Sequence, residues 1–359
     1  MPGGHAPGTA ERDLDDRPLV VVWEATRACA LACRHCRASA QRRPAPDELT
    51  PAEARDLLAQ IGRIRPPVFV ITGGDPLERA DLFERIAEAA AMGLRVSLAP
   101  SVTARLQRQT VASLAALGCA GIQLSLDGAD AETHDRFRGC PGTFARTMRA
   151  CGWVREEGIP LSLGTTVSTH NADQLDELYE LVGSLGAARW DLFFLVPAGR
   201  AQAGEMIPPT LAEAVMIWLA AVSTDAPFAI KTTEAPQLRR VLAARRPDPN
   251  GRPAVGDGKG FVFIAANGDI RPSGFLPLVA GNTRRDDLLA TYRRDPLFRA
   301  LRDPDALTGP RCSQCGYRRT CGGSRSRAYA VYGDPLADDP LCAHVPPSPA
   351  PSASGGVPC

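Results

Sequence analysis

Three cysteines near the N-terminus, Cys29, Cys33 and Cys36, are spaced so closely that they could all bind one metal group. Thiolates are soft ligands, which favour zinc and iron–sulfur clusters. A structural zinc site uses four protein ligands, and so does a 4Fe–4S cluster held only by protein. Three cysteines would leave one iron of such a cluster open to another molecule, where chemistry can occur. A zinc knuckle that lacks its fourth ligand is the alternative.

A second group of cysteines lies near the C-terminus and contains four thiols, Cys312, Cys315, Cys321 and Cys342. Four thiolates complete the coordination of a zinc ion or of a 4Fe–4S cluster, so this site is expected to be closed. The residues alone leave both options open. Without a secretory signal, a disulfide framework is not expected. The scattered cysteines are given no role: Cys119, Cys140, Cys151 and Cys359.

Strand and helix patterns alternate from residue 20 onward. Short apolar runs predict strands at 20–26, 68–72, 94–99, 121–126, 160–167 and 190–196. The stretches between them predict helices at 51–64, 80–92, 104–117, 143–157 and 172–186. Strands separated by helices of this length indicate βαβ units and an α/β fold with a parallel sheet. A six-unit partial barrel and an open doubly wound sheet both fit this pattern.

The alternation changes after residue 198, where a basic, proline-punctuated stretch at 236–259 interrupts it. Asn267-Gly268 is a favoured two-residue turn between strands. A helix, a hairpin and two short helices are therefore expected at 211–224, 261–271, 285–291 and 295–302.

Small polar residues follow two of the predicted strands. The second strand is followed by Gly73, Gly74, Asp75 and Pro76, and the fourth by Ser125 and Asp127. Glycines at a strand end let the backbone approach a ligand closely. Because active sites of barrels assemble at the C-terminal ends of the strands, we expect these residues to face a common ligand.

The first cysteine group and these strand ends resemble the radical S-adenosylmethionine (SAM) family. Its signature is C-x3-C-x2-C with an aromatic residue before the last cysteine, a place that His35 takes here. The resemblance implies a partial (β/α)6 TIM-like barrel and a 4Fe–4S cluster whose open iron is chelated by SAM. One electron from the cluster then cleaves SAM to methionine and a 5′-deoxyadenosyl radical, which abstracts a hydrogen atom from the substrate.

The same resemblance assigns cofactor contacts. The turn at 73–76 is similar to the GGEP motif that hydrogen-bonds the SAM amino group, with Asp75 in place of glutamate. Ser125 and Asp127 are similar to an S-x-D-G segment whose serine contacts SAM. Arg138 could pair with the SAM carboxylate, since a guanidinium fork suits a carboxylate, or could be an ordinary surface charge. Weaker candidates for the adenine pocket, or else barrel core, are Thr166, Val167 and Leu195.

The second cysteine group resembles the SPASM domain of many radical SAM enzymes, which binds an outer auxiliary 4Fe–4S cluster through this pattern. The stretch that would bind the family's inner auxiliary cluster contains Ser273 and no cysteine. A further family cysteine beyond Cys321 is also missing, with Ser324 and Arg325 in its place. We therefore expect two clusters in all, one that binds SAM and one auxiliary cluster. Electron transfer ranks first among the roles of the auxiliary cluster, ahead of structural pinning and sulfur donation.

The resemblance also implies a domain organisation. The radical SAM core is expected over residues 18–225 and a SPASM-like domain with its linker over 226–345. Residues 1–17 are expected to be a flexible lead, and the Pro-, Ser- and Gly-rich segment 346–359 a disordered tail.

The substrate is expected to be a small molecule that is carboxylated or tetrapyrrole-like. The segments 194–200 and 321–330 look like those of radical SAM enzymes that modify tetrapyrrole side chains. There Arg200, Arg325 and Arg327 could pair with substrate carboxylates, or be structural. Maturation of a ribosomal peptide is the alternative, although about eighteen residues before the first strand are too few for a peptide-recognition domain. A reducing partner such as ferredoxin or flavodoxin is expected.

Composition limits the other classes of function. The 41 basic and 40 acidic residues balance, so neither nucleic acid nor an anionic membrane is an expected partner. No apolar run approaches the length of a membrane span, and the first eighteen residues lack a signal core, so a cytoplasmic enzyme is expected. A non-catalytic, zinc-stabilised binding protein and an iron–sulfur electron carrier remain as alternatives from other classes.

Overall fold

A computed structural model describes residues 14–245 and 255–346 of the chain. Most of the expected flexible lead (1–17) lies outside the described residues. So do part of the basic stretch (236–259) and nearly all of the expected tail (346–359), including Cys359.

Ten strands of the described residues form one sheet in the order β10-β9-β8-β1-β2-β3-β4-β5-β6-β7. From β1 to β7, each strand pairs in parallel with the next strand of the chain. These strands are β1 Val20–Glu24, β2 Val68–Thr72, β3 Val96–Leu98, β4 Gly121–Ser125, β5 Leu161–Val167, β6 Arg189–Phe194 and β7 Ala229–Thr233. An open doubly wound sheet would reverse its strand order, and this sheet does not.

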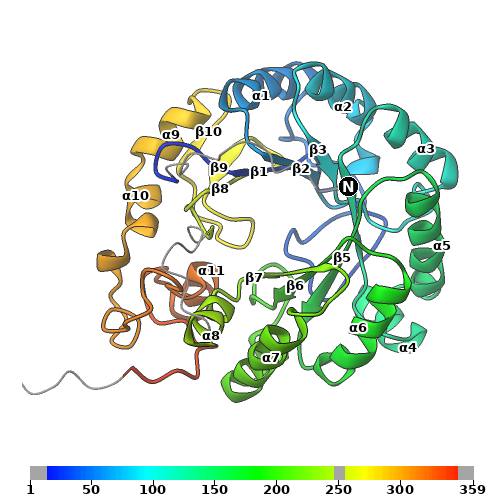
Figure 1. Ribbon diagram of the computed structural model, residues 1–359. Helices are drawn as coiled ribbons and strands as arrows, with labels where there is room; N and C mark the ends of the chain where they lie inside the picture. The colour runs from blue at the N-terminus through cyan, green and yellow to red at the C-terminus, as the bar shows by residue number, and fades with distance from the viewer. Residues whose placement is uncertain (1–13, 246–254, 347–359) are drawn as a thin grey trace, which may run out of the picture.

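Because successive parallel strands are neighbours and their crossovers are right-handed, the helices all fall on one face of the sheet and the sheet curls. Figure 1 shows the result, an incomplete barrel with helices outside and strands inside. The partial-barrel prediction is confirmed. The outer helices are α1 Pro51–Ile64, α2 Leu82–Ala91, α3 Arg108–Ala116, α4 Ala131–Arg138, α5 Thr143–Glu156, α6 Leu175–Ser184 and α7 Pro209–Val222.

Helix α1 illustrates how local sequence defines an element. The Thr50 side chain accepts the backbone N–H of Glu53, the Glu53 carboxylate accepts the N–H of Thr50, and Pro51 occupies the first turn. Apolar residues three or four positions apart then form the face that packs against the sheet: Ala54, Leu57, Leu58, Ile61 and Ile64. The predicted bounds of this helix, 51–64, match the structure.

The C-terminal part of the chain extends the sheet beyond β1. Strand β8 (Phe261–Ile264) pairs in parallel with β1, and β9 (Asp269–Arg271) and β10 (Gly281–Asn282) follow in antiparallel order. The hairpin predicted around Asn267-Gly268 is therefore present as β8 and β9. The helices of this part are α8 Gln237–Arg245, α9 Leu288–Arg294, α10 Pro296–Arg302 and α11 Arg325–Tyr332.

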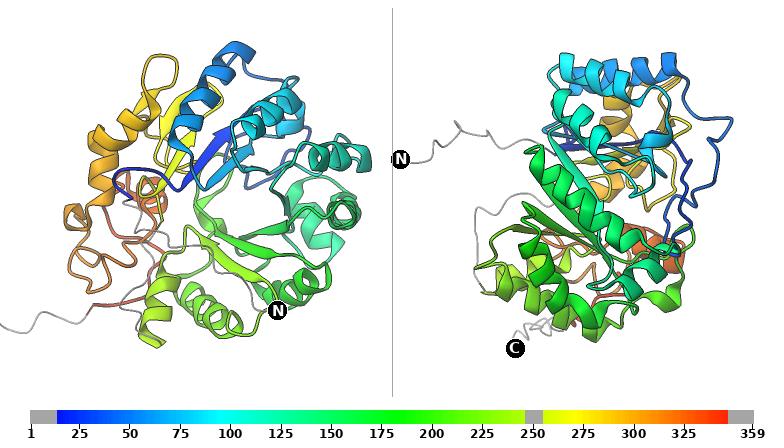
Figure 2. Two further views of the ribbon diagram at one scale, coloured as in Figure 1. Left: turned by 45° about the horizontal axis from the view of Figure 1, so that its top comes forward. Right: turned by 90° about the vertical axis from the view of Figure 1, so that its right-hand side faces the viewer.

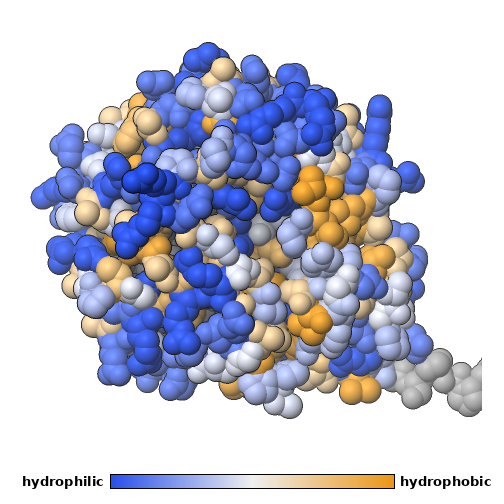
Figure 3. Space-filling view, turned by 180° about the vertical axis from the view of Figure 1, so that it is seen from behind, coloured by the Kyte–Doolittle hydropathy of each residue, from blue (hydrophilic) through white to orange (hydrophobic). Residues whose placement is uncertain are grey.

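Helix α11 and the loops around it occupy the gap that the barrel leaves between β7 and β8 (Figure 1). The long loop between β1 and α1, which carries the first cysteine group, runs outside one end of the barrel (Figure 2). The back of the molecule is mostly hydrophilic, with apolar residues in small groups (Figure 3). The candidate site lies at the end of the barrel where the β1–α1 loop and the segment around α11 (Arg325–Tyr332) meet.

Candidate active site

The three cysteines of the first group lie together in one cluster. Cys29 and Cys33 are buried, and Cys36 is partly buried and packs against them. Burial raises the pKa of the Cys29 thiol, so a bound cation is needed to make the thiolate its stable form. Within the described ranges, no three His, Cys, Asp or Glu side chains converge closely enough to hold a single metal ion. A cluster site is indicated instead by the set of N–H donors around the three cysteine sulfurs.

Each of the three sulfurs accepts one hydrogen bond from an N–H group. The donors are the Leu31 amide to Cys29 (3.3 Å), the Ala40 amide to Cys36 (3.4 Å) and the Arg138 guanidinium to Cys33 (3.6 Å). Such hydrogen bonds stabilise cluster-bound thiolates and tune the reduction potential of a cluster. The donor set therefore suits a 4Fe–4S cluster bound by three cysteines.

The glycine turn after β2 touches the backbone that leads into this cysteine group. The Gly74 amide donates to the Thr26 carbonyl (2.7 Å), and the Asp75 amide donates to the Ala28 carbonyl (2.7 Å). A Cβ atom on Gly74 would lie 2.4 Å from the Ala28 carbonyl oxygen, closer than any side chain can come. Only glycine therefore fits at position 74, and the turn and the cysteine group support each other.

Replacing Gly74 by alanine is expected to push the cysteine loop away from the turn. We expect Gly74→Ala to lose about half of its iron after anaerobic reconstitution, the share of the first cluster, as measured by iron analysis. The matched control is Gly152→Ala in α5, where a new Cβ meets no atom within 4 Å. This control should keep its iron and gain about 0.5–1 kcal/mol of stability from helix propensity. Full iron content in Gly74→Ala would contradict the geometry.

The Asp75 carboxylate turns inward and organises the glycine turn. It accepts hydrogen bonds from the Thr103 hydroxyl (2.8 Å), the Leu77 amide (3.2 Å) and the Ser101 amide (3.3 Å). The Ser101 hydroxyl donates to the Gly74 carbonyl (2.8 Å). The sequence analysis missed Ser101 and Thr103, although they too are small polar residues that follow a strand, here β3. A contact between Asp75 and SAM stays a prediction.

The buried Asp75 makes the stability of the fold depend on pH. Burial raises the pKa of Asp75 from 3.8 to about 6, against the hydrogen bonds that it accepts. The folded state therefore binds a proton that the unfolded state has already lost between these pKa values. The stability that Asp75 contributes is fully present below the unfolded pKa of 3.8 and is lost as the pH rises through about 6.

Asp75→Asn removes the titrating carboxyl group. Comparing the melting temperatures of the wild type and this variant at two pH values therefore tests the raised pKa of Asp75. The melting temperature of the wild type relative to Asp75→Asn should be higher at about pH 5 than at about pH 7, since only the wild type has lost the proton at the higher pH. A difference that is the same at both pH values would contradict the raised pKa.

A buried ion pair supports the other side of the cysteine group. Arg138 at the end of α4 pairs with Asp127 (3.0 Å), and Asp127 also accepts the Thr166 amide (2.7 Å). The ring of His35 stacks on Phe137 with a centroid distance of 4.1 Å. Burial, followed by the charge of Arg138, holds the pKa of His35 well below its usual value, so His35 is neutral.

The remaining predicted SAM contacts lie at the expected strand ends. Ser125 is the last residue of β4 and stands opposite Gly164 of β5. Val167 and Leu195 are buried, which agrees with barrel core. Since Arg138 already has a carboxylate partner in Asp127, a SAM carboxylate would have to share its guanidinium. The individual SAM contacts stay predictions.

Arg200, in the loop after β6, contacts the cysteine loop, which agrees with the structural alternative for this arginine. Its guanidinium donates to the carbonyl groups of Cys33 (2.8 Å) and Ala40 (2.9 Å), and its amide donates to the Cys36 carbonyl (3.1 Å). The preceding Gly199 has φ 64° and packs directly on the Cys36 carbonyl, where a Cβ atom would lie at 2.3 Å. Arg200 therefore positions the cysteine loop.

The second cysteine group surrounds the start of α11. The charges of Cys342 and Cys312 act on the Cys321 thiol, which places these three thiols near one another, and burial raises the pKa of Cys321 to about 12. Each sulfur of the group has a backbone amide beside it: Asp339 for Cys312, Tyr317 for Cys315, Gly323 for Cys321 and His344 for Cys342. Amide donors around buried sulfurs suit thiolate ligands.

Arg325 and Arg327 of α11 also have internal partners, which agrees with the structural alternative for both. Arg325 donates to the carbonyl groups of Pro335 (2.8 Å) and Ala337 (2.7 Å). Arg327 is fully buried and forms an ion pair with Asp339 (3.0 Å). Ser273, in the place of an inner-cluster cysteine, donates its hydroxyl to Glu234 (3.4 Å).

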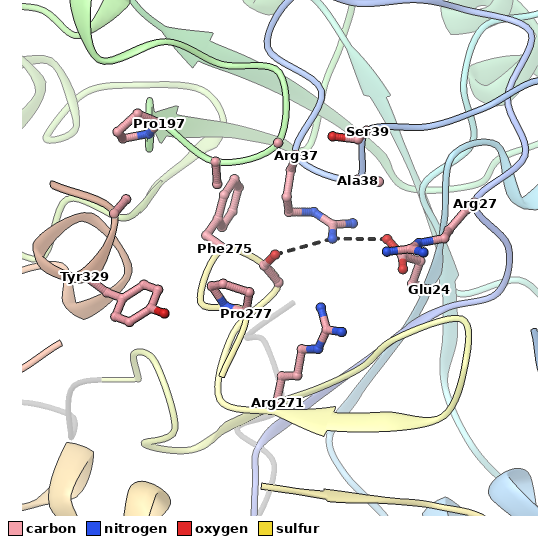
Figure 4. A pocket seen from close by; sticks show the side chains of 14 residues that line it. Glu24, Arg27, Arg37, Ala38, Ser39, Pro197, Arg271, Phe275, Pro277 and Tyr329 are labelled. Atoms are coloured by element: carbon pink, nitrogen blue, oxygen red, sulfur yellow. Dashed lines mark hydrogen bonds and ion pairs between the residues drawn. The ribbon is translucent and has the colours of Figure 1, made fainter. Parts of the chain in front are cut away.

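A cavity of about 300 Å³ opens beside the cysteine loop (Figure 4). Residues of the β1–α1 loop, the β6 end, β9 with the loop that follows it, and α11 line it. A volume of this size lies in the range of small-molecule sites. The cavity thus connects the first cysteine group with the C-terminal segment.

Comparison with known proteins decides the family. Residues 23–182 match the family model "Radical SAM superfamily". An AdoMet-dependent heme synthase from Nitratidesulfovibrio vulgaris is 36% identical, and the match covers 96% of this chain and 97% of that protein. The chain belongs to the radical SAM superfamily. It is therefore an enzyme of the class that uses a 4Fe–4S cluster and SAM.

Other proteins resemble this one over most of their length. An AdoMet-dependent heme synthase from Methanosarcina barkeri is 35% identical over 93% of this chain and 98% of that protein. A PqqA peptide cyclase from Rhodopseudomonas palustris is 28% identical over 92% and 88%. The structure of Streptococcus suis SuiB bound to S-adenosylmethionine shares the fold, with a TM-score of 0.72, 19% identity and coverage of 92% and 78%.

Over residues 14–245 and 255–346, every helix is too short or too polar to cross a bilayer.

Proposed function

We propose that this radical SAM enzyme modifies a carboxylated tetrapyrrole, as a SAM-dependent heme synthase. The observation that carries the proposal is the similarity, along nearly the whole of both chains, to heme synthases of a bacterium and an archaeon. The similarity extends over both the barrel and the C-terminal segment. These two parts line the cavity together, so a substrate bound there would contact both.

The residues around the first cysteine group are proposed to hold the cofactors. Cys29, Cys33 and Cys36 would bind the 4Fe–4S cluster and leave one iron for SAM, near the glycine turn and Arg138. When bound, the cluster supplies the electron for the reductive cleavage of SAM. The chain's own contribution is to bury the cysteine loop, to orient it through Arg200, and to keep water away from the reaction.

The second cysteine group is proposed to bind one auxiliary 4Fe–4S cluster that transfers electrons. The proximity of Cys312, Cys321 and Cys342 and the amides beside all four sulfurs support this assignment. Ser273 stands where an inner cluster would need a thiolate, so we propose that no second auxiliary cluster binds there. The domain bounds 18–225 and 226–345 remain part of the proposal. So do a cytoplasmic location and reduction by a ferredoxin or flavodoxin.

Peptide modification is the second candidate, and the similarity to a PqqA peptide cyclase over most of both chains favours it. Because the identity to this cyclase is 28%, against 36% to the heme synthase, peptide modification ranks behind tetrapyrrole modification.

Metal analysis and product analysis test the proposal. After anaerobic reconstitution we expect roughly eight irons per chain, four for each cluster. With SAM and dithionite, a carboxylated porphyrin such as Fe-coproporphyrin III should change in mass as 5′-deoxyadenosine accumulates. Zinc without iron would overturn the assignment of the two cysteine groups to iron–sulfur clusters. An unchanged mass across porphyrins of different carboxylate number would overturn the tetrapyrrole assignment.

A further inference from the structure

Three arginines and one glutamate line the cavity beside the cysteine loop. Arg27 and Arg37 come from the loop after β1, Arg271 from β9, and Glu24 from the end of β1 (Figure 4). The formal charge of this lining is positive, because three guanidinium groups face one carboxylate. An anionic ligand would therefore be attracted to the cavity.

The charge of Arg37 is neutralised by a carboxylate of the protein itself. Arg37 forms an ion pair with the buried Glu24 (3.1 Å) and donates to the Gly274 carbonyl (3.4 Å), the two contacts drawn in Figure 4. It also lies over the ring of Phe263, 4.7 Å from the centroid. Arg37 and Glu24 therefore form a fixed, neutral wall of the cavity.

Arg27 and Arg271 retain hydrogen-bonding capacity. In the part of the chain that the structure describes, the Arg27 guanidinium has neither an ion-pair nor a hydrogen-bond partner, although its backbone amide is held by Glu48 (2.8 Å). Arg271 is anchored through one terminal nitrogen to Asp269 (2.9 Å), whereas its buried Nε–H donates to no acceptor among the described residues. A buried donor without an acceptor is unfavourable, and a ligand oxygen would satisfy it.

The other walls are mostly apolar or aromatic. Phe275, Pro277, Pro197 and the ring of Tyr329 line the cavity together with the arginines. Arg27 and Arg271 come from different segments of the cavity lining, so the cavity offers two separate guanidinium groups, each able to bind one anionic group. Carboxylates suit the guanidinium fork, and the apolar walls suit a hydrophobic body between them.

We propose that this cavity is the substrate site and that Arg27 and Arg271 each bind one carboxylate of a substrate with at least two carboxylates on an apolar body. This inference rests on the proposed function, because the tetrapyrrole supplies the body and the carboxylates. It assigns substrate recognition to Arg27 and Arg271, which line the cavity, and not to Arg200, Arg325 and Arg327, which do not.

Ligand binding to the reconstituted enzyme tests the inference, with coproporphyrin III and its tetramethyl ester as probes. The wild type should bind the free acid more tightly than the ester. Arg27→Met and Arg271→Met should each weaken binding of the acid by about ten- to hundredfold, the loss of one charged hydrogen-bonding partner, and leave binding of the ester unchanged. Arg271→Lys should recover part of the loss.

Two controls separate recognition from damage to the cluster. Arg55→Met removes an exposed arginine of α1 that pairs with Glu88, and it should bind both probes like the wild type. Because Arg27 lies two residues before Cys29, iron content is measured for each variant, and binding is compared between samples of equal iron content.

The outcomes distinguish the inference from the proposed function. If the wild type modifies the porphyrin but both arginine variants bind the acid like the wild type, the inference is wrong and the function stands. If the wild type binds the acid through both arginines yet leaves its mass unchanged, the inference stands and the function is wrong. If the wild type binds neither probe, both are wrong.

Discussion

Cys33→Ala is expected to reduce 5′-deoxyadenosine release to the level of the reaction without enzyme. Cys33 lies in the buried cysteine group, and Arg138 and Arg200 hold its sulfur and its carbonyl. With two thiolates left, the first cluster would lack the set of ligands that leaves one iron for SAM. The measurement is 5′-deoxyadenosine by liquid chromatography after anaerobic reconstitution with SAM and dithionite.

The matched control for this variant is Cys119→Ala. Cys119 is also buried, but it belongs to the hydrophobic core and donates its thiol to the Gly121 carbonyl (3.3 Å). Cys119→Ala should keep its iron and its 5′-deoxyadenosine release. Wild-type release from Cys33→Ala would show that SAM is cleaved elsewhere and would overturn the assignment of the first cysteine group.

Arg327→Met is expected to cause the largest loss of stability. Arg327 and Asp339 are both fully buried, and Arg327 also donates to the carbonyl groups at the ends of β6 and β7. The ion pair therefore joins helix α11 and the loop that follows it to the barrel. Removing one partner of a buried ion pair leaves an uncompensated charge and typically costs about 3–5 kcal/mol.

Thermal melts of the reconstituted protein under anaerobic conditions measure this effect. Arg63→Met is the control, because Arg63 pairs with Asp287 on the surface, where both side chains are about half exposed or more. Surface pairs contribute little, so the control should melt close to the wild type. Equal melting temperatures for Arg327→Met and Arg63→Met would contradict the role of the buried pair.

Elements with strong local signals were predicted well. Helix α1 and strand β2 have the predicted bounds, because a capping box, a first-turn proline and a continuous run of β-branched and aromatic residues act within a few residues. Elements without such signals were missed. Strand β7 is a half-exposed, polar strand that depends on pairing with β6, and α11 begins with two arginines whose burial depends on distant partners.

The same distinction applies to the candidate site. The cysteine spacing and the glycine turn predicted which residues come together, since their function depends on short segments. The arginines could not be assigned from the sequence. Arg200 and Arg327 look like free cations but have internal partners more than a hundred residues away, whereas Arg27 and Arg271 were not singled out.

The sequence by itself determined the family, the grouping of the first three cysteines and the alternation of strands and helices from β1 to β6, because each depends on residue types at short, regular spacing. The tertiary structure decided which charged groups are neutralised inside the protein and which face the cavity. That depends on the barrel closing around α11 and on contacts between segments far apart in the chain, which no local pattern encodes.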